Sequence, residues 1–158
     1  MANVHTITVT GITAQQQPRA EPCEGTVTCG FKIAKSDEEQ QLVFGWASVA
    51  ERANGEQVVD WQDDIVEISE LEKAAYDFVQ FYREGSEMHK RGGTNVAEAI
   101  ESMVFTPEKR AMLGIPEGVV PNGWWLGFKV NDRDVWEKVK NGTYKMFSIE
   151  GQATRVQV

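Results

Sequence analysis

A histidine and a serine are the first candidates for catalytic residues in this chain. It has two histidines, His5 and His89, and residues 90–93 after His89 read as a flexible loop that leaves its imidazole open to a substrate. Ser148 lies in a strand-like apolar run, where a serine is an unusual choice. A serine hydroxyl becomes a good nucleophile when an imidazole takes its proton. Each residue alone also fits a packing or surface role, so the pair is a hypothesis.

The residues around Ser148 do not form the nucleophile elbow of the α/β-hydrolases. That motif is Gly-x-Ser-x-Gly, and here Met146 and Glu150 occupy the glycine positions. Gly151 follows and leaves room for a backbone amide to point at a developing oxyanion. The alternative is a serine at the edge of the core that bonds a neighbouring strand.

An acidic group is the main candidate for metal binding. Asp60, Asp63, Asp64 and Glu67 could hold a divalent cation through their carboxylate oxygens. Their spacing matches no calcium-loop template, and a solvated turn is the favoured interpretation. We therefore expect neither a metal nor another cofactor.

Bulk composition limits the classes of protein that the chain can belong to. It has 158 residues, a formal net charge of −8 and a pI of about 4.8. A surplus of carboxylates disfavours nucleic acid as a partner. No run is long and apolar enough for a membrane span, and the first ten residues lack a secretory signal. Cys23 and Cys29 are expected to be reduced thiols, because structural zinc usually takes four ligands.

Local patterns predict three helices. Residues 69–72, Ser-Glu-Leu-Glu, match a capping box, so a helix should begin at Ser69, bury one apolar stripe and end at Gly85. Thr106 followed by proline predicts a second, short helix. Asp132 or Asp134 should cap a third, which closes at residues 141–142.

Strand patterns alternate with these helices. Strands are expected at residues 26–33, 42–49, 57–59, 87–89, 96–105, 124–130 and 144–149, with a hairpin turn at residues 54–55. No βαβ rhythm and no internal repeat occur. These elements predict an α+β, mostly β fold: a small antiparallel β-barrel with outer helices. Trp124 and Trp125 are expected in the core rather than in a substrate groove.

Several longer segments follow one another in a specific order. They include Phe-Gly-Trp-Ala-Ser at 44–48, Val-Asp-Trp-Gln-Asp-Asp-Ile at 59–65, Glu-Met-His at 87–89, Glu-Ser at 101–102, Gly-Trp-Trp-Leu-Gly-Phe-Lys-Val at 123–130 and Met-Phe-Ser-Ile at 146–149. The helical segments 71–79 and 135–142 belong to the same series. From about residue 43 to residue 155 the chain resembles the XkdF-like group of phage prohead proteases, which are distantly similar to the herpesvirus assemblins.

The resemblance implies a serine endopeptidase that cleaves scaffold and major capsid proteins during prohead maturation, and that also cleaves itself. Ser148 matches the nucleophile of the family and His89 its general base. The implied location is the interior of the phage prohead in the host cytoplasm. Residues 42–158 would form the protease domain, and residues 1–41 an N-terminal arm or edge strands.

The third catalytic residue is less well defined. Glu101, in a strand-like run, is the preferred candidate to orient His89. Glu87 and Glu150 are alternatives, as is a residue beyond Val158.

Two further functions are compatible with the sequence. One is a catalytically inactive capsid-assembly or scaffold-interacting module of the same fold. The other is a metal-dependent hydrolase that uses His89 with Asp60 and Asp63.

Overall fold

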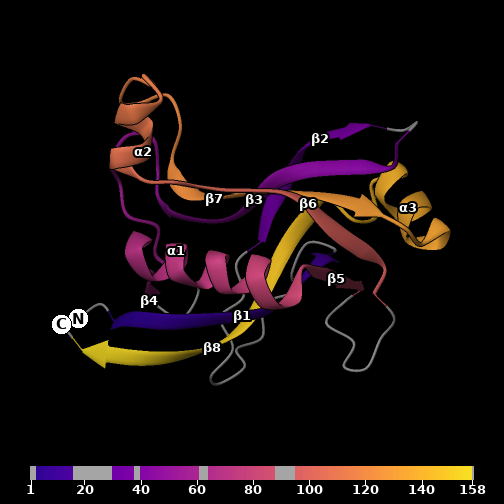
Figure 1. Ribbon diagram of the computed structural model, residues 1–158, viewed down its shortest axis with the longest axis horizontal. Coiled ribbons are helices and arrows are strands. Elements are labelled where there is room, and N and C mark those ends of the chain that lie inside the picture. The colour runs from indigo at the N-terminus through magenta and orange to yellow at the C-terminus, as the bar shows by residue number, and fades with distance from the viewer. Residues whose placement is uncertain (1–2, 16–29, 38–39, 61–63, 88–94, 158) are drawn as a thin grey trace.

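The computed structural model describes residues 3–15, 30–37, 40–60, 64–87 and 95–157, which form a sheet with helices packed against it (Figure 1). The strands are β1 (Asn3–Gln15), β2 (Gly30–Asp37), β3 (Leu42–Glu51), β4 (Asp64–Ile65), β5 (Glu84–Glu87), β6 (Ala97–Phe105), β7 (Asn122–Val130) and β8 (Met146–Gln157). The helices are α1 (Ile68–Asp77), α2 (Pro107–Met112) and α3 (Arg133–Lys140), and α1 continues as a π-helical turn, η1 (Phe78–Tyr82). The predicted α+β, mostly β chain is confirmed.

The strands form one mixed sheet in the order β4-β1-β5-β6-β7-β3-β2-β8, and β1 pairs in addition with β8. Most pairs are antiparallel, whereas β1 runs parallel to β4 and to β5. The β1–β8 pairing runs from Asn3↔Gln157 to Gln15↔Met146, so the first and last strands lie side by side (Figure 1). The predicted barrel of antiparallel strands is not confirmed, because β1 runs parallel to β4 and to β5.

Both strands from the first 41 residues pair with later parts of the chain. β1 contacts β8, and β2 lies between β3 and β8. Of the strand expected at residues 26–33, the described part begins at Gly30 and continues to Asp37. The division of the chain into residues 1–41 and 42–158 stays a prediction.

The hairpin expected after residue 42 is only partly formed. β3 extends to Glu51, and Gly55 adopts a φ of 84° in the turn, as glycine readily does. The returning chain makes isolated bridges, Glu51↔Gln57 and Val59↔Ile65, instead of a second full strand.

The N-terminal ends of α2 and α3 confirm the local predictions. The Thr106 hydroxyl accepts the N–H of Lys109 at 3.2 Å. An oxygen of Asp132 accepts the N–H groups of Asp134 and Val135, both at 2.9 Å, so Asp132 is the residue that caps α3. Each cap satisfies backbone donors that the helix itself leaves open.

The prediction for the start of α1 is wrong. The N-cap is Glu67, without a side-chain cap, and Ser69 lies inside the helix. The glutamate expected to complete a capping box, Glu72, instead accepts a hydrogen bond from Lys109 on α2. A tertiary contact thus replaces the local one.

The end of α1 also differs from the prediction. The helix widens into η1 and stops at Arg83, which has a φ of 59° and donates its N–H to the carbonyl of Phe78 at 3.0 Å. Gly85, predicted as the stop, is the second residue of β5. Arg83 adopts a left-handed conformation that normally favours glycine, so the sequence does not reveal it.

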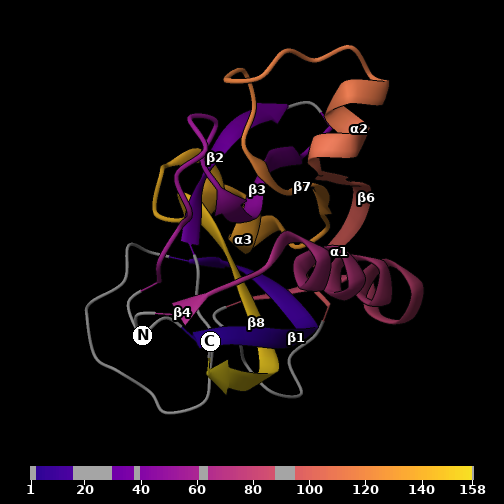
Figure 2. The same ribbon diagram turned by 90° about the vertical axis from the view of Figure 1, so that its left-hand side faces the viewer.

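The core lies between α1, α3 and the inner face of the curved sheet (Figure 2). Phe78 packs edge-on against Trp124 at 5.4 Å between ring centroids, and Phe128 packs against Phe147 at 5.5 Å. Trp124 is fully buried, which confirms its expected place in the core. Trp125 lies on the other face of β7, half-buried beside Trp46 at 5.5 Å.

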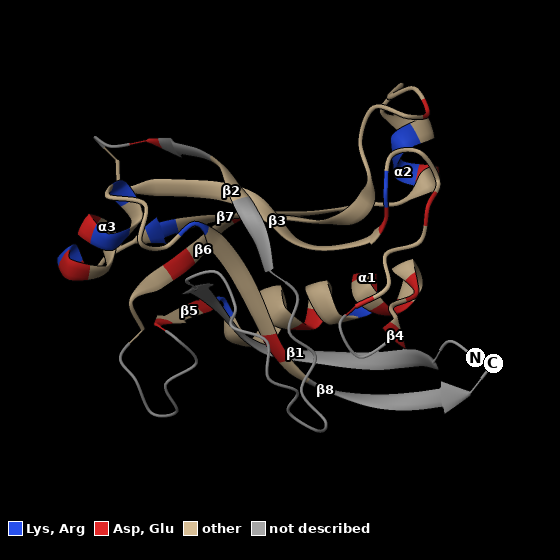
Figure 3. Cartoon of the chain, turned by 180° about the vertical axis from the view of Figure 1, so that it is seen from behind, with Lys and Arg blue, Asp and Glu red and all other residues tan. Residues whose placement is uncertain are grey.

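Acidic and basic residues are intermixed on the helices, and further charged residues lie on strands and loops (Figure 3). In the part of the chain that the structure covers, no helix has the length and apolar character to span a membrane.

Candidate active site

Ser148 lies in β8 with its side chain fully buried. Its neighbours Phe147 and Ile149 belong to the hydrophobic core. Because successive strand residues point to opposite faces, Ser148 points away from that core. It pairs with Thr13 of β1 on one side and with Gly30 of β2 on the other.

The strand register brings β5 to the other side of β1 at this level. Thr13 pairs with Ser148 and also with Ser86 of β5, so Ser86 and Ser148 occupy one row across three strands. Two strand spacings put their Cα atoms about 10 Å apart. The described part of β5 ends at Glu87, and His89 lies outside the described residues.

The β1–β8 pairing shifts in register close to Ser148. Val9 pairs with Gly151 and Gly11 with Glu150, so one extra residue of β1 is accommodated between them. Such bulges bend a strand, increase its twist and often lie next to active sites. Gly151, predicted to leave space for an oxyanion, lies within β8 opposite this bulge.

Glu101 does not lie next to Ser148. It projects from β6 into solvent, and its carboxylate accepts the indole N–H of Trp125 at 2.7 Å. In the strand order, β5 and β1 separate β6 from β8. Glu101 also lies beyond the part of β6 that pairs with β5, which is Ala97 and Glu98.

The other two candidate carboxylates lie closer to Ser148 in the sheet. Glu150 is two residues further along β8, and strand alternation puts it on the face of Ser148. Glu87, at the end of β5, is in register with Ala14, whose partner on β8 is Phe147. Strand alternation thus puts Glu150, but not Glu87, on the face of Ser148.

Glu87 belongs to a polar cluster that sequence reasoning missed. Its carboxylate accepts the hydroxyl of Tyr144 at 2.6 Å and the ammonium of Lys138. Burial first, and then the hydrogen bond to Glu87, raises the pKa of Tyr144. The hydrogen bond to Glu87 raises the pKa of Lys138. We call Glu87, Lys138 and Tyr144 the β5–β8 cluster.

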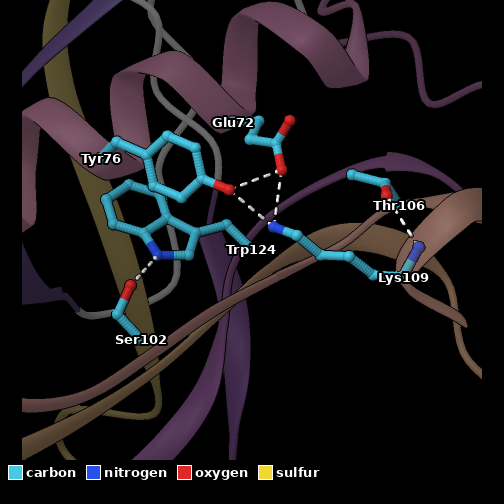
Figure 4. A network of polar contacts seen from close by, with 6 residues as sticks. All are labelled: Glu72, Tyr76, Ser102, Thr106, Lys109 and Trp124. Atoms are coloured by element: carbon cyan, nitrogen blue, oxygen red, sulfur yellow. Dashed lines mark hydrogen bonds and ion pairs between the residues drawn. The ribbon is translucent and has the colours of Figure 1, made fainter. Parts of the chain in front are cut away.

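A second cluster of the same residue types joins α1 to α2 (Figure 4). Glu72 accepts from Lys109 at 2.6 Å and from the Tyr76 hydroxyl at 2.8 Å, and Lys109 donates to that hydroxyl at 2.7 Å. The hydrogen bond from Lys109 holds the pKa of Glu72 below its usual value. Burial lowers the pKa of Lys109, but its hydrogen bonds to Glu72 and Tyr76 outweigh burial and raise it. These three residues form the α1–α2 cluster.

The sequence carried a signal for one of these contacts only. Glu72 and Tyr76 are four residues apart on a predicted helix, the spacing at which side chains meet. Glu87 is separated from Lys138 by 51 positions and from Tyr144 by 57, so no local pattern links them.

The sequence predicted that the acidic group of residues 60–67 forms a solvated turn. In the structure this turn is not fully solvated. Asp64 is buried at 1% exposure, and its N–H donates to the Asp60 carboxylate at 2.9 Å. The backbone N–H of Asp60 donates in return to the carbonyl of Asp64 at 2.9 Å. Asp63 lies outside the described residues, as do Cys23 and Cys29. Among the residues that can be described, no three metal-ligating side chains gather.

Comparison with known proteins defines the class of this chain. A family model described as "Putative phage serine protease XkdF" matches residues 31–157, so the chain belongs to that phage serine protease family. This confirms the resemblance to the XkdF-like group, whereas the similarity to the herpesvirus assemblins stays a prediction.

One curated relative is the "Uncharacterized protein YqbD" of Bacillus subtilis (strain 168), 31% identical over 125 residues. The match covers 79% of this chain and 35% of the relative, so the chain spans about a third of that protein's length. No solved structure matches the chain.

Proposed function

We propose that the chain is a serine endopeptidase in which Ser148 is the nucleophile and His89 the general base. Its proposed substrates are the scaffold and major capsid proteins of a tailed phage, and the protease itself. The proposed site of action is the interior of the prohead, within the host cytoplasm. Membership of the phage serine protease family supports the reaction class.

The observation that carries this proposal is the register of β5, β1 and β8. Ser86 and Ser148 share one row through Thr13, and β5 ends one residue after Ser86. His89 follows Glu87 by two residues, and a chain covers at most about 7 Å over two residues. The end of β5, two residues before His89 in the sequence, thus lies two strand spacings from the strand that carries Ser148, although 59 positions separate the two proposed catalytic residues.

The chemistry proposed for this pair is acyl transfer. The Ser148 oxygen attacks the scissile carbonyl carbon while His89 accepts the hydroxyl proton, and the C–N bond breaks as His89 passes that proton to the leaving amine. Water then attacks the acyl carbon while His89 accepts a water proton; the ester C–O bond to Ser148 breaks as His89 passes that proton to the serine oxygen, and the carboxylic acid product leaves.

For the residue that orients His89, the geometry favours Glu150 over Glu101 and Glu87. Glu150 shares the strand face of Ser148, whereas Glu87 lies in the row of Phe147, on the opposite face, and accepts hydrogen bonds from Lys138 and Tyr144. Glu101 is exposed and three strand-to-strand steps from β8 by way of β5 and β1. Glu101→Gln is therefore expected to retain most activity.

Labelling with a fluorophosphonate tests the assignment of Ser148. The wild type should form a covalent adduct on Ser148, and Ser148→Ala should form none. His89→Ala should react at least about 100-fold more slowly than the wild type, because a general base contributes that much. Peptide mapping of the adduct identifies the labelled residue. Equal labelling of the wild type and Ser148→Ala, or no labelling of the wild type, would refute the proposal.

The complete burial of Ser148 favours a second candidate function, a capsid-assembly or scaffold-interacting module without turnover. A nucleophile must meet its substrate, so the proposed enzyme has to open around Ser148. A phage that carries Ser148→Ala discriminates the two functions: the protease requires uncleaved scaffold and failed head maturation, whereas the inactive module requires normal heads.

A further inference from the structure

The carboxylate of Glu87 joins three elements that are distant in sequence. Glu87 ends β5, Lys138 lies in α3, and Tyr144 lies two residues before β8. Besides the two bonds to Glu87, the Tyr144 N–H donates to the Lys138 carbonyl at 3.0 Å, and the Lys138 ammonium lies 5.5 Å from the centre of the Tyr144 ring. Each member thus contacts the other two, and the cluster ties the end of β5 to the lead-in of β8.

The hydrogen bond between Glu87 and Tyr144 in this tie is largely shielded from water. Tyr144 is 6% exposed, and the side chain of Glu87 is 16% exposed. A hydrogen bond between a carboxylate and a hydroxyl is stronger and more directional when water does not compete for it. The phenol of Tyr144 is neutral and the ammonium of Lys138 is charged at neutral pH, and the raised pKa of each group extends these states to higher pH.

The cluster lies next to the proposed nucleophile along the strands. Tyr144 precedes Ser148 by four residues, and Glu87 shares a register row with Phe147, the neighbour of Ser148. β1 lies between β5 and β8, so their relative position otherwise depends on backbone pairing through a third strand. The cluster fixes that position directly.

We propose that Glu87, Lys138 and Tyr144 are positioning residues that hold the end of β5, the strand that leads into His89 in the sequence, in place relative to Ser148. The inference rests on the proposed function, because it assigns the cluster a role in the reaction of those two residues. None of the three touches the reacting atoms in this role. A displacement of about 1 Å between reacting groups can cost up to about 100-fold in rate.

The α1–α2 cluster supplies a matched control. Tyr144→Phe and Tyr76→Phe each remove one hydroxyl from a glutamate–lysine–tyrosine cluster, but Glu72 and Lys109 lie on α1 and α2 instead of β5 and α3. Differences between these variants therefore report the location of the cluster.

The experiment measures the rate of fluorophosphonate labelling at Ser148, well below the melting temperature of each variant. Tyr144→Phe should react about 10- to 100-fold more slowly than the wild type, and Tyr76→Phe at the wild-type rate. Circular dichroism checks that each protein is folded, so that the comparison excludes unfolded material. Equal rates for the two variants would overturn the positioning role.

Lys138 offers a second pair of variants in case Tyr144→Phe does not fold. Its side chain is 40% exposed, so replacement is compatible with folding. Lys138→Met should slow the labelling of Ser148 several-fold, and Lys138→Arg should restore it, since arginine can still donate to Glu87. Equal rates for the methionine and arginine variants would count against the proposal. No labelling of Ser148 in the wild type would instead refute the proposed function, and with it this role.

Discussion

The α1–α2 cluster and the β5–β8 cluster contain the same three residue types in different surroundings. In the α1–α2 cluster, Glu72 and Tyr76 lie one helical turn apart, and Tyr76 is 54% exposed. In the β5–β8 cluster Glu87 accepts from Lys138 of α3 and from Tyr144, which precedes β8, and Tyr144 is buried. The two clusters thus differ chiefly in the tyrosine, which is exposed in one and buried in the other, whereas both lysines are partly exposed.

This difference shows that the residue types of a polar cluster do not by themselves define its role. Exposed ion pairs contribute little to stability because water replaces them well. A buried hydroxyl that loses its acceptor pays the full cost of desolvation. The β5–β8 cluster should therefore matter more for folding as well as for the proposed reaction.

Removal of the central carboxylates should give the largest contrast between the clusters. Glu87→Ala leaves the buried Tyr144 hydroxyl without this acceptor and should lower the free energy of unfolding by about 2 kcal/mol. Glu72→Ala should cost less than about 1 kcal/mol, because its partners are partly exposed and alanine favours the helix. Urea denaturation of both variants measures the difference. Equal losses, or a larger loss for Glu72→Ala, would contradict the comparison.

A contrast between local and distant contacts explains which helix ends the sequence predicted correctly and which it did not. The caps at Thr106 and Asp132 depend on residues two or three positions away, and both were predicted. The capping box at Ser69 failed because Lys109, 37 positions from Glu72, contacts the glutamate that the box required. The stop at Arg83 failed because the π-helical turn is closed by a residue that rarely adopts a positive φ.

The candidate site likewise has features that the sequence could predict and features that depend on contacts between distant parts of the chain. Ser148 and His89 could be proposed from residue type and family resemblance, and their roles remain predictions. The row through Ser86, Thr13 and Ser148 joins three strands from distant parts of the chain, so periodicity could not reveal it. The burial of Asp64 likewise depends on the fold, since nothing in the residue types around it distinguishes it from Asp60 or Asp63.

The two lysines should differ in how far they hold their helices in place. α2 has no buried residue, so the contact of Lys109 with Glu72 is a main tie to α1, whereas α3 buries Val135, Trp136 and Val139. Lys109→Met should therefore speed amide hydrogen exchange in α2 about fivefold, equivalent to about 1 kcal/mol of local stability. Lys138→Met should leave exchange in α3 within about twofold of the wild type. Hydrogen exchange followed by mass spectrometry measures both helices, and a larger effect in α3 would reverse the comparison.

The smallest expected effect is a difference in pH dependence. The pKa of Glu72 is lowered in the folded state from its usual value of 4.5, so its stabilisation is present above pH 4.5 and is lost as pH falls through the folded pKa. The pKa of Tyr144 is raised from its usual value of 10.0, so its stabilisation is present below pH 10 and is lost as pH rises through the folded pKa.

The stability difference between the wild type and Glu72→Gln, a few tenths of a kcal/mol, should shrink in acid. The difference between the wild type and Tyr144→Phe should shrink in alkali, because the folded protein then has to bury a phenolate or release a proton. Urea denaturation across this pH range checks both trends. If both differences shrank at the same end of the range, the hydrogen bonds would not set the two pKa values in the way the structure indicates.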